Sequence, residues 1–351
     1  MKKRIGLVFG GRSNEHEISI LSAASVLTAI DRNKYEPVPI AIDKDGVWYL
    51  VHTPLDGVSD LSDTRIESLF SDARRVTFTD FDAMTDFAFP MLHGPFGEDG
   101  TIQGFFEMLG KPYAGCGVAA SAISMDKIFM KEVWGRGGLP QCRYTYTTRR
   151  LCSQPKLLES EVERIERELP YPIFVKPANM GSSVGVSKTS DRAGLKTAIR
   201  EALEYDKRVI AEQMIPGREI EIGVIGNDDP AVSVVGEILP ERDYYDYYSK
   251  YKSAGTKLVI PADIPERIRL QIGELAKEAY LTLGGEGFAR IDLFYNEDEE
   301  RAYLNEMNSI PGFTQFSMFP LLWGAKGIGF TELIERIIEL GYERYNAAHH
   351  R

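Results

Sequence analysis

Apolar positions at the start of the chain follow two different spacings. Residues 5–9 form a short continuous apolar run that ends at Gly10-Gly11, as a buried strand before a turn would. From residue 18 to residue 30, apolar side chains recur at every third position, which is roughly helical spacing. Asn14, with Glu17 three residues later, resembles a capping box. The pattern predicts a strand, a glycine turn and a capped helix.

Two further apolar runs, at residues 38–42 and 87–92, have the composition of buried strands. Helix-length segments separate them, which is typical of a parallel sheet covered by helices. Residues 52–80 contain many Asp and Ser together with Pro and Gly, so we expect a polar insertion there. Residues 1–120 are therefore predicted to form an N-terminal α/β domain.

The rest of the chain is predicted to form two more units, a small central domain over residues 121–211 and a C-terminal domain over residues 212–351. A tyrosine-rich segment, 244–251, is expected to be an ordered loop. The expected helices cover about 126–134, 156–168, 191–204, 264–279 and 330–340, and the expected strands cover 173–176, a segment ending at Glu212, 288–295 and 301–307.

Charge and composition exclude several classes of protein. The 351 residues include 41 Lys and Arg against 52 Asp and Glu, a net charge of −11, so we expect neither nucleic acid nor membrane as a partner. The N-terminal apolar run is too short for a signal peptide, and no stretch approaches the roughly 18 apolar residues of a membrane-spanning helix. Three cysteines without pairing or metal-site spacing fit a cytoplasmic protein.

The clearest candidate chemistry lies on the two strands near the C-terminus. Because side chains alternate along a strand, Arg290 and Asp292 share one face, and Glu306 and Asn308 share one face of the next strand. If those faces coincide, two carboxylates and an amide oxygen converge, which suits Mg²⁺ together with substrate phosphates. Arg290 would then offset charge on a transferring group. The alternative is a hairpin whose polar face only meets water.

A glycine-rich segment, 179–185, directly follows the strand that carries Lys176. Backbone N–H groups in such a turn can form an anion-binding nest, to which Lys176 would add a charge. The segment lacks the G-x-x-x-x-G-K-[ST] pattern, so the usual P-loop is not supported, and a plain loop is the alternative. His93 follows another predicted strand at the edge where α/β sheets bind ligands, although a single histidine in such a place is more often a hydrogen-bonded structural residue.

Six motifs in one order resemble the D-alanine:D-alanine ligase family of the ATP-grasp superfamily, across nearly the whole chain. They are GGRSNEHEIS at 10–19, LHGPFGEDGTIQG at 92–104, SAISMDK at 121–127, VKPANMGSSVGVSK at 175–188, YDYYSKY at 245–251, and ARIDLF at 289–294 with LNEMNSIPGFTQFS at 304–317.

The resemblance implies an ATP-grasp fold: an N-terminal parallel-sheet α/β domain, a small central domain and a C-terminal catalytic domain that clasp ATP between two sheets. The implied reaction phosphorylates the carboxylate of one D-alanine to an acyl phosphate, which the amine of a second D-alanine attacks. The dipeptide would serve peptidoglycan synthesis. The implied cofactors are ATP and two Mg²⁺ (or Mn²⁺), and a homodimer is expected.

The resemblance also implies roles for residues that match the motifs. Asp292, Glu306 and Asn308 would bind the metal ions; Lys127, Lys176 and Lys250 would contact phosphates; Glu212 and Glu219 would bind the adenine and ribose sides; Glu15, His93, Arg290 and Ser317 would bind the amino acids. Arg290 and the N–H of Gly312 would donate to the oxyanion, and Glu15, Ser182 and Tyr251 would hydrogen-bond the loop that covers the site.

The second substrate is the open part of this interpretation. Family members that make the D-alanyl-D-lactate ester tend to lack a tyrosine at the position of Tyr251, which favours the amide product here. A D-serine-accepting ligase is one alternative. Another ATP-grasp ligase, such as a carboxylase, or a non-catalytic nucleotide-binding module are more distant ones.

Overall fold

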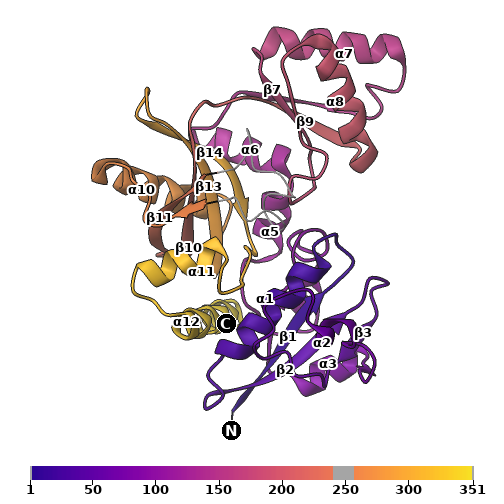
Figure 1. Cartoon of the computed structure of the whole chain (residues 1–351), viewed down its shortest axis with the longest axis vertical. Coiled ribbons are helices and arrows are strands. Elements are labelled where there is room, and N and C mark those ends of the chain that lie inside the picture. Colours follow the sequence, from indigo (N-terminus) through magenta and orange to yellow (C-terminus); the bar gives the residue numbers. More distant parts are fainter. Residues whose placement is uncertain (1, 240–256, 350–351) are drawn as a thin grey trace.

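The computed structural model describes residues 2–239 and 257–349. Over these residues the chain builds three sheets, stacked along the long axis of the molecule (Figure 1). The N-terminal sheet has the order β4-β3-β2-β1-β5, with the bounds Arg74–Arg75, Trp48–Leu50, Tyr35–Ile42, Lys3–Gly10 and Phe87–Met91.

The three long strands of this sheet are parallel, as the apolar runs predict. β1 pairs with β2 on one side and with β5 on the other, and α1 (His16–Ala29) packs against them. The predicted capping box is wrong. Glu15 is the N-cap residue of α1 and makes no capping hydrogen bond through its side chain.

The expected polar insertion is only partly polar. It contains α2 (Thr64–Glu67), β4 and the start of α3 (Phe78–Met84). Leu55 and Leu69 from this segment are buried in the core of the N-terminal sheet. The segment therefore packs as part of the domain rather than standing apart from it.

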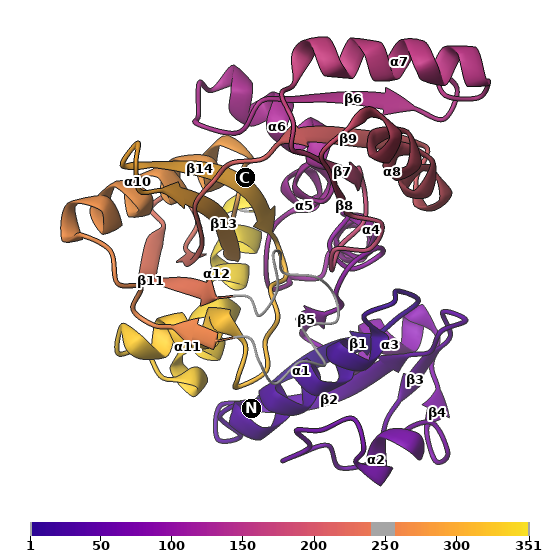
Figure 2. The same cartoon turned by 45° about the horizontal axis from the view of Figure 1, so that its top comes forward.

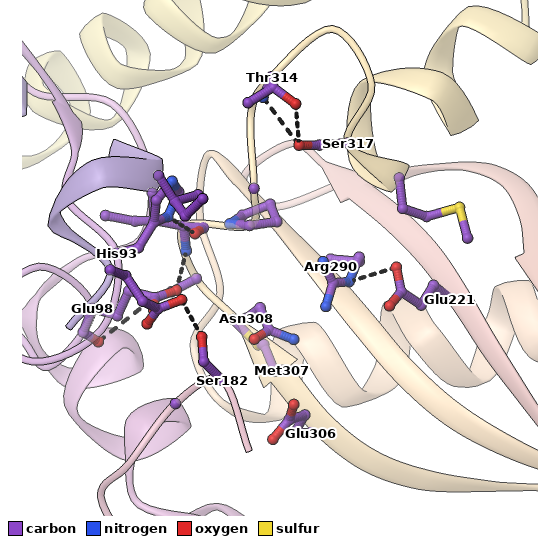
Figure 3. A pocket seen from close by; sticks show the side chains of 18 of the residues that line it. His93, Glu98, Ser182, Glu221, Arg290, Glu306, Met307, Asn308, Thr314 and Ser317 are labelled. Carbon is purple, nitrogen blue, oxygen red and sulfur yellow. Dashed lines mark hydrogen bonds and ion pairs between the residues drawn. The ribbon is translucent and has the colours of Figure 1, made fainter. Parts of the chain in front are cut away.

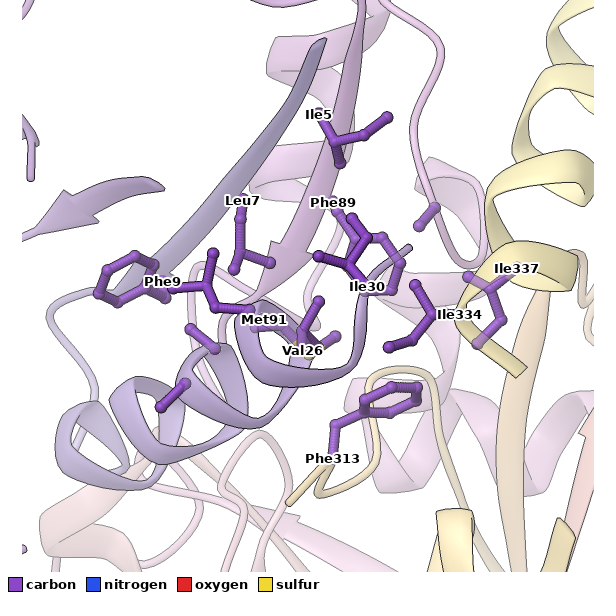
Figure 4. Packing of buried hydrophobic residues seen from close by; sticks show 14 of the residues in the cluster. Ile5, Leu7, Phe9, Val26, Ile30, Phe89, Met91, Phe313, Ile334 and Ile337 are labelled. Carbon is purple, nitrogen blue, oxygen red and sulfur yellow. The ribbon is translucent and has the colours of Figure 1, made fainter. Parts of the chain in front are cut away.

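The C-terminal helix α12 (Phe330–His349) shares that core. Ile334 and Ile337 lie beside Ile30 and Phe89, and Phe313 from a distant loop joins them (Figure 4). Burying these side chains removes a large apolar area from water. This burial stabilises the packing of α12 against the N-terminal sheet. The helix is longer than the predicted 330–340.

The middle sheet is built from residues 144–213 and carries two helices on one side (Figure 2). Its order is β6-β9-β7-β8, with the bounds Tyr144–Thr148, Arg208–Gln213, Ile173–Pro177 and Ser187–Thr189, and its helices are α7 (Pro155–Glu168) and α8 (Arg192–Tyr205). These elements confirm the predicted helices and strands of the segment. The domain boundaries remain predictions, and β9 runs across the one placed between residues 211 and 212.

The third sheet is antiparallel throughout. Its order is β12-β11-β10-β13-β14, with the bounds Lys257–Val259, Ala231–Leu239, Arg218–Ile225, Phe288–Asn296 and Arg301–Asn308. Helix α10 (Glu266–Thr282) packs on one face of the sheet. Helix α11 (Met318–Ala325) lies so close to the opposite face that a Cβ at Gly223 would stand 2.6 Å from Nε1 of Trp323.

Three short helices link the N-terminal sheet to the other two. They are α4 (Thr101–Met108), α5 (Val118–Met125) and α6 (Lys127–Arg136). The side chain of Asp126 accepts hydrogen bonds from the N–H groups of Ile128 and Phe129 and so caps α6. Within residues 2–239 and 257–349, no helix is long and apolar enough to cross a membrane.

Candidate active site

The predicted faces of the C-terminal hairpin coincide. β13 and β14 pair so that Arg290 lies opposite Asn308 and Asp292 opposite Glu306. The neighbouring strand β10 brings Glu221 opposite Asp292 from the other side. We call Glu221, Arg290, Asp292, Glu306 and Asn308 the hairpin cluster.

Arg290 is the only cation among the five side chains of the hairpin cluster. Its Nε lies 2.7 Å from Oδ1 of Asp292 and 2.9 Å from Oε2 of Glu221. The amide nitrogen of Asn308 donates to Oδ2 of Asp292 at 2.9 Å. One positive charge thus faces three carboxylates, and the cluster has an excess of negative charge on a largely buried surface.

This donor set fits a hard divalent cation. Among the described residues no three acidic, His or Cys side chains converge tightly enough to form a complete protein cage. Mg²⁺ does not require one, because it usually keeps waters and substrate phosphates beside one or two carboxylates. Asp292 and Glu306 face each other across the hairpin, with the amide of Asn308 beside them.

Lys127 bridges the hairpin to the glycine-rich segment. It is the first residue of α6, and its Nζ lies 3.3 Å from Oε2 of Glu306. The same Nζ donates to the carbonyl oxygen of Met180 at 3.0 Å. Lys127 therefore contacts both the hairpin and the glycine-rich segment.

On the middle sheet, one carboxylate lies between two lysines. Oε2 of Glu212 is 2.5 Å from Nζ of Lys176, and its Oε1 is 3.3 Å from Nζ of Lys131, which is completely buried. Burial alone would raise the pKa of Glu212, but the two lysines outweigh it and lower that pKa to about 2. We call Lys131, Lys176 and Glu212 the lysine cluster.

Two adjoining cavities lie between the sheets. The smaller, of about 180 Å³, is lined by Glu219 and by members of both clusters: Lys176 and Glu212 of the lysine cluster, and Glu221, Asp292 and Glu306 of the hairpin cluster. The larger, of about 390 Å³, opens beside the N-terminal sheet (Figure 3). Among its lining residues are the predicted amino-acid-binding and oxyanion residues Glu15, His93, Ser182, Arg290, Gly312 and Ser317.

The glycine-rich segment reaches across to the N-terminal sheet. The hydroxyl of Ser182 donates to Oε1 of Glu15, which precedes α1. Ser182 and the next residue, Ser183, both have left-handed backbone conformations, with φ of 49° and 58°. Such conformations are unfavourable for residues other than glycine, so the segment is held in place by its surroundings.

His93 lies in the wall of the larger cavity with both ring nitrogens bonded to protein atoms. Nδ1 is 3.0 Å from the carbonyl oxygen of Ile310, so it must carry the proton, and Nε2 is 2.9 Å from the hydroxyl of Ser22. Burial lowers the pKa of His93, which keeps the ring neutral.

The predicted site residues within the described ranges all line one or both of the two cavities. Lys250 and Tyr251 lie outside the described residues. Sequence reasoning missed Glu98, Lys131 and Glu221. Lys131 is one helical turn from Lys127, and alternation along β10 places Glu221 on the face of Glu219, so two of the three had a detectable signal.

Two sheets enclose the smaller cavity, one of them carrying lysines and the other acidic side chains. This arrangement is that of an ATP-grasp ligase. The chain belongs to the D-alanine–D-alanine ligase family. Family models described as "D-ala D-ala ligase N-terminus" and "D-ala D-ala ligase C-terminus" match residues 4–116 and 133–339.

The similarity to known ligases extends over almost the whole chain. D-alanine–D-alanine ligases of Geobacillus thermodenitrificans and Acetivibrio thermocellus are 46% and 43% identical, each covering 98% of this chain and 97% of the relative. Among solved structures, the VanG D-Ala:D-Ser ligase of Enterococcus faecalis has a TM-score of 0.85 at 33% identity, covering 97% of this chain and 100% of that one. The D-alanine-D-alanine ligase of Coxiella burnetii has the same score and identity, covering 99% and 96%.

Proposed function

We propose that this protein joins two D-alanines into D-alanyl-D-alanine, using ATP and passing through a D-alanyl phosphate. The supporting observation is the pair of opposed clusters around one cavity, in a chain of the D-alanine–D-alanine ligase family. Phosphates need positive charge, and a divalent cation needs oxygen ligands. The lysine cluster supplies the positive charge, and the hairpin cluster supplies the oxygen ligands.

In the first half-reaction, a carboxylate oxygen of the first D-alanine attacks the γ-phosphorus of ATP, and ADP leaves. Lys127 and Lys176 reduce the repulsion between these anions, and Glu212 and Glu219 hold the nucleoside end. Asp292, Glu306 and Asn308 would bind Mg²⁺, which offsets the phosphate charge. Binding the reactants in line supplies much of the remaining rate enhancement.

In the second half-reaction, the amine of the second D-alanine attacks the acyl carbon, and phosphate leaves. Arg290 and the N–H of Gly312 would donate to the oxyanion of the tetrahedral intermediate, where such donors are most effective. Glu15 would hold the ammonium of the first substrate and Ser317 the carboxylate of the second. We assign His93, as a neutral ring, a place near the first substrate's carboxylate.

The loop from residue 179 to residue 185 protects the acyl phosphate from water in this proposal. Its Ser182 already bonds to Glu15. Closing a site in this way prevents hydrolysis of a reactive intermediate. Lys250 and Tyr251 remain predicted members of the same cover, from the sequence alone.

The deciding experiment measures ADP release from ATP and Mg²⁺ with D-alanine, and in parallel with bicarbonate, followed by product identification. We expect ADP release only with D-alanine, in equal amount to D-alanyl-D-alanine. Release that depends on bicarbonate would identify a carboxylase, and the absence of release with either would contradict the ligase assignment. Replacing Mg²⁺ with Mn²⁺ tests which metal ion is used.

A D-alanine:D-serine ligase is the second candidate, because the VanG ligase is among the similar structures. Competition of D-alanine with D-serine and with D-lactate, at pH 6 and pH 8, distinguishes the products. We expect the D-alanine dipeptide to dominate at both values. Dominant ester or D-serine product at both would replace the proposed second substrate. Cytoplasmic location and a homodimer remain predictions.

A further inference from the structure

The loop between β14 and α11, residues 309–317, carries both Gly312 and Ser317. The end near α11 is fixed by bonds within the loop, because Ser317 Oγ accepts the N–H of Thr314 at 3.1 Å and Ser317 N–H donates to the carbonyl of Thr314 at 2.9 Å. The other end, around Ile310, is held instead by side chains of the N-terminal domain. The position of Gly312 therefore depends on contacts from another part of the chain.

Both backbone polar groups of Ile310 are bonded to the segment after β5. Its N–H donates to Oε1 of Glu98 at 3.1 Å, and its carbonyl accepts from Nδ1 of His93 at 3.0 Å. The second carboxyl oxygen of Glu98, Oε2, accepts the N–H of Gly94 at 2.8 Å. Glu98 thus joins the turn at residue 94 to the loop at residue 310 through one side chain.

A further contact continues this arrangement toward Gly312. The hydroxyl of Ser22, on α1, lies 2.9 Å from Nε2 of His93 and 3.4 Å from the N–H of Phe313. Ile310 and Phe313 are both buried, so the loop is fixed on each side of Gly312. No member of this group is a ligand in the metal site proposed above.

We propose that Glu98 is a positioning residue for the second half-reaction, which holds the loop 309–317 so that the Gly312 N–H points at the oxyanion. The inference rests on the proposed function. Removing the carboxyl group leaves two buried N–H groups without an acceptor and frees the loop to move. A misplacement of about 1 Å at a reacting centre can cost about 10²-fold in rate.

Asp99 provides a matched control from the same segment. Its carboxylate also accepts two backbone N–H groups, from Phe96 at 2.9 Å and from Thr101 at 3.0 Å, but both belong to its own loop. Asp99→Ala therefore removes the same number of backbone bonds as Glu98→Ala, from a more exposed position, without touching residues 309–317. A purely local structural role predicts the same result for both variants.

Glu98→Gln tests whether a side chain with the shape of the Glu98 carboxyl group is sufficient to hold the loop. Burial, with the charge of Glu15 beside it, raises the pKa of Glu98 to about 8. An amide therefore resembles the neutral group present near pH 7, and it keeps one oxygen that accepts an N–H. Its NH₂ end cannot accept the second, so we expect partial rather than full rescue.

The experiment measures kcat, KM for the second D-alanine, ATP affinity and thermal midpoint in the full chain. For Glu98→Ala we expect kcat about 10- to 10²-fold lower and a raised second KM, with ATP affinity within about twofold. The kcat of Glu98→Gln should lie between those of Glu98→Ala and the wild type. Asp99→Ala should keep kcat within about threefold of the wild type. Equal losses in Glu98→Ala and Asp99→Ala would overturn the proposal. Should Glu98→Ala fail to fold, Glu98→Gln against Asp99→Asn decides by the same criterion.

Amide hydrogen exchange separates this inference from the proposed function, because it needs no substrate. We expect the N–H groups of Ile310 and Phe313 to exchange at least about tenfold faster in Glu98→Ala and unchanged in Asp99→Ala. Unchanged protection in both would overturn the positioning role even in an active ligase. Faster exchange in Glu98→Ala, in a protein that makes no dipeptide, would contradict the proposed function alone.

Discussion

The lysine cluster and the hairpin cluster are built from the same kinds of side chain in opposite proportions. In the first, one carboxylate lies between two lysines, and in the second, one arginine lies among three carboxylates. Glu212 and Lys131 are almost entirely enclosed, whereas Glu306 and Asn308 keep part of their surface toward the cavities. The clusters face each other, and Lys127 contacts Glu306 across the gap.

The two clusters meet different requirements of a ligase that uses a nucleotide: one offers positive charge to the phosphates, and the other offers oxygen ligands to a divalent cation. The lysine cluster has an excess of positive charge, which the phosphates of a nucleotide would offset. The hairpin cluster has an excess of negative charge, which a divalent cation would offset. We therefore expect substitutions in the lysine cluster to lower stability as well as nucleotide binding, and substitutions in the hairpin cluster to change chiefly turnover.

Glu306→Gln should have the largest effect and is the direct test of the hairpin half of the comparison. It keeps the size of the side chain but removes a proposed metal-binding charge, so we expect ADP release to fall by at least about 10²-fold. Circular dichroism and the thermal midpoint should stay as in the wild type. Asp298→Asn, in the exposed turn of the same hairpin, is the control and should keep full activity. Retained turnover in Glu306→Gln would reject the metal assignment.

Glu212→Gln should lower stability, which Glu306→Gln leaves unchanged. It leaves two buried lysines without their shared carboxylate, and breaking a buried ion pair in this way costs about 3–5 kcal/mol in the free energy of unfolding. Urea unfolding measures the loss. Glu204→Gln, on the exposed surface of α8, should change stability by less than about 0.5 kcal/mol. A stable Glu212→Gln protein would show that the lysine cluster does not support the fold.

The pH dependence of stability is a smaller and separate test of Glu212. Its pKa is about 2 in the folded chain against a usual 4.5, so the unfolded chain binds more protons between these values. The contribution of Glu212 is therefore complete above about pH 5 and is lost as the pH falls toward 2. Compared with the wild type, Glu212→Gln should lose less stability across this interval. Equal slopes would mean that Glu212 is not held ionised by the two lysines.

Alternation along strands predicted four of the five residues of the hairpin cluster, because register is a local property. The pairing of Asp292 with Glu306 follows once the two strands and their short turn are recognised. Glu221 was missed because β10 was not predicted, although Ile220, Ile222 and Val224 alternate with polar residues there. The parallel strands of the N-terminal sheet, two strands of the middle sheet, the β13–β14 hairpin and most of the longer helices were predicted from the pattern of apolar positions, whereas β6, β8, β11 and β12 were not.

The lysine cluster and the contact of Glu98 with Ile310 depend on tertiary structure. Nothing local shows that Lys131 is fully buried, and residues 98 and 310 are 212 positions apart in the chain. The left-handed conformations of Ser182 and Ser183 were equally hidden, because serine gives no signal for a positive φ. Such features arise from packing between domains, which a single sequence does not record.

Ser183→Gly should have the smallest effect and tests the loop that lies between the two clusters. Glycine adopts φ near 58° without steric penalty, so the folded state should gain about 0.5–1 kcal/mol, measured by urea unfolding. Ser187→Gly in the extended strand β8 is the control and should lose a similar amount, because glycine is unfavourable in a strand. If Ser183→Gly is instead destabilising, contacts of the Ser183 side chain outweigh the backbone strain, and the loop is held by those contacts rather than against its own preference.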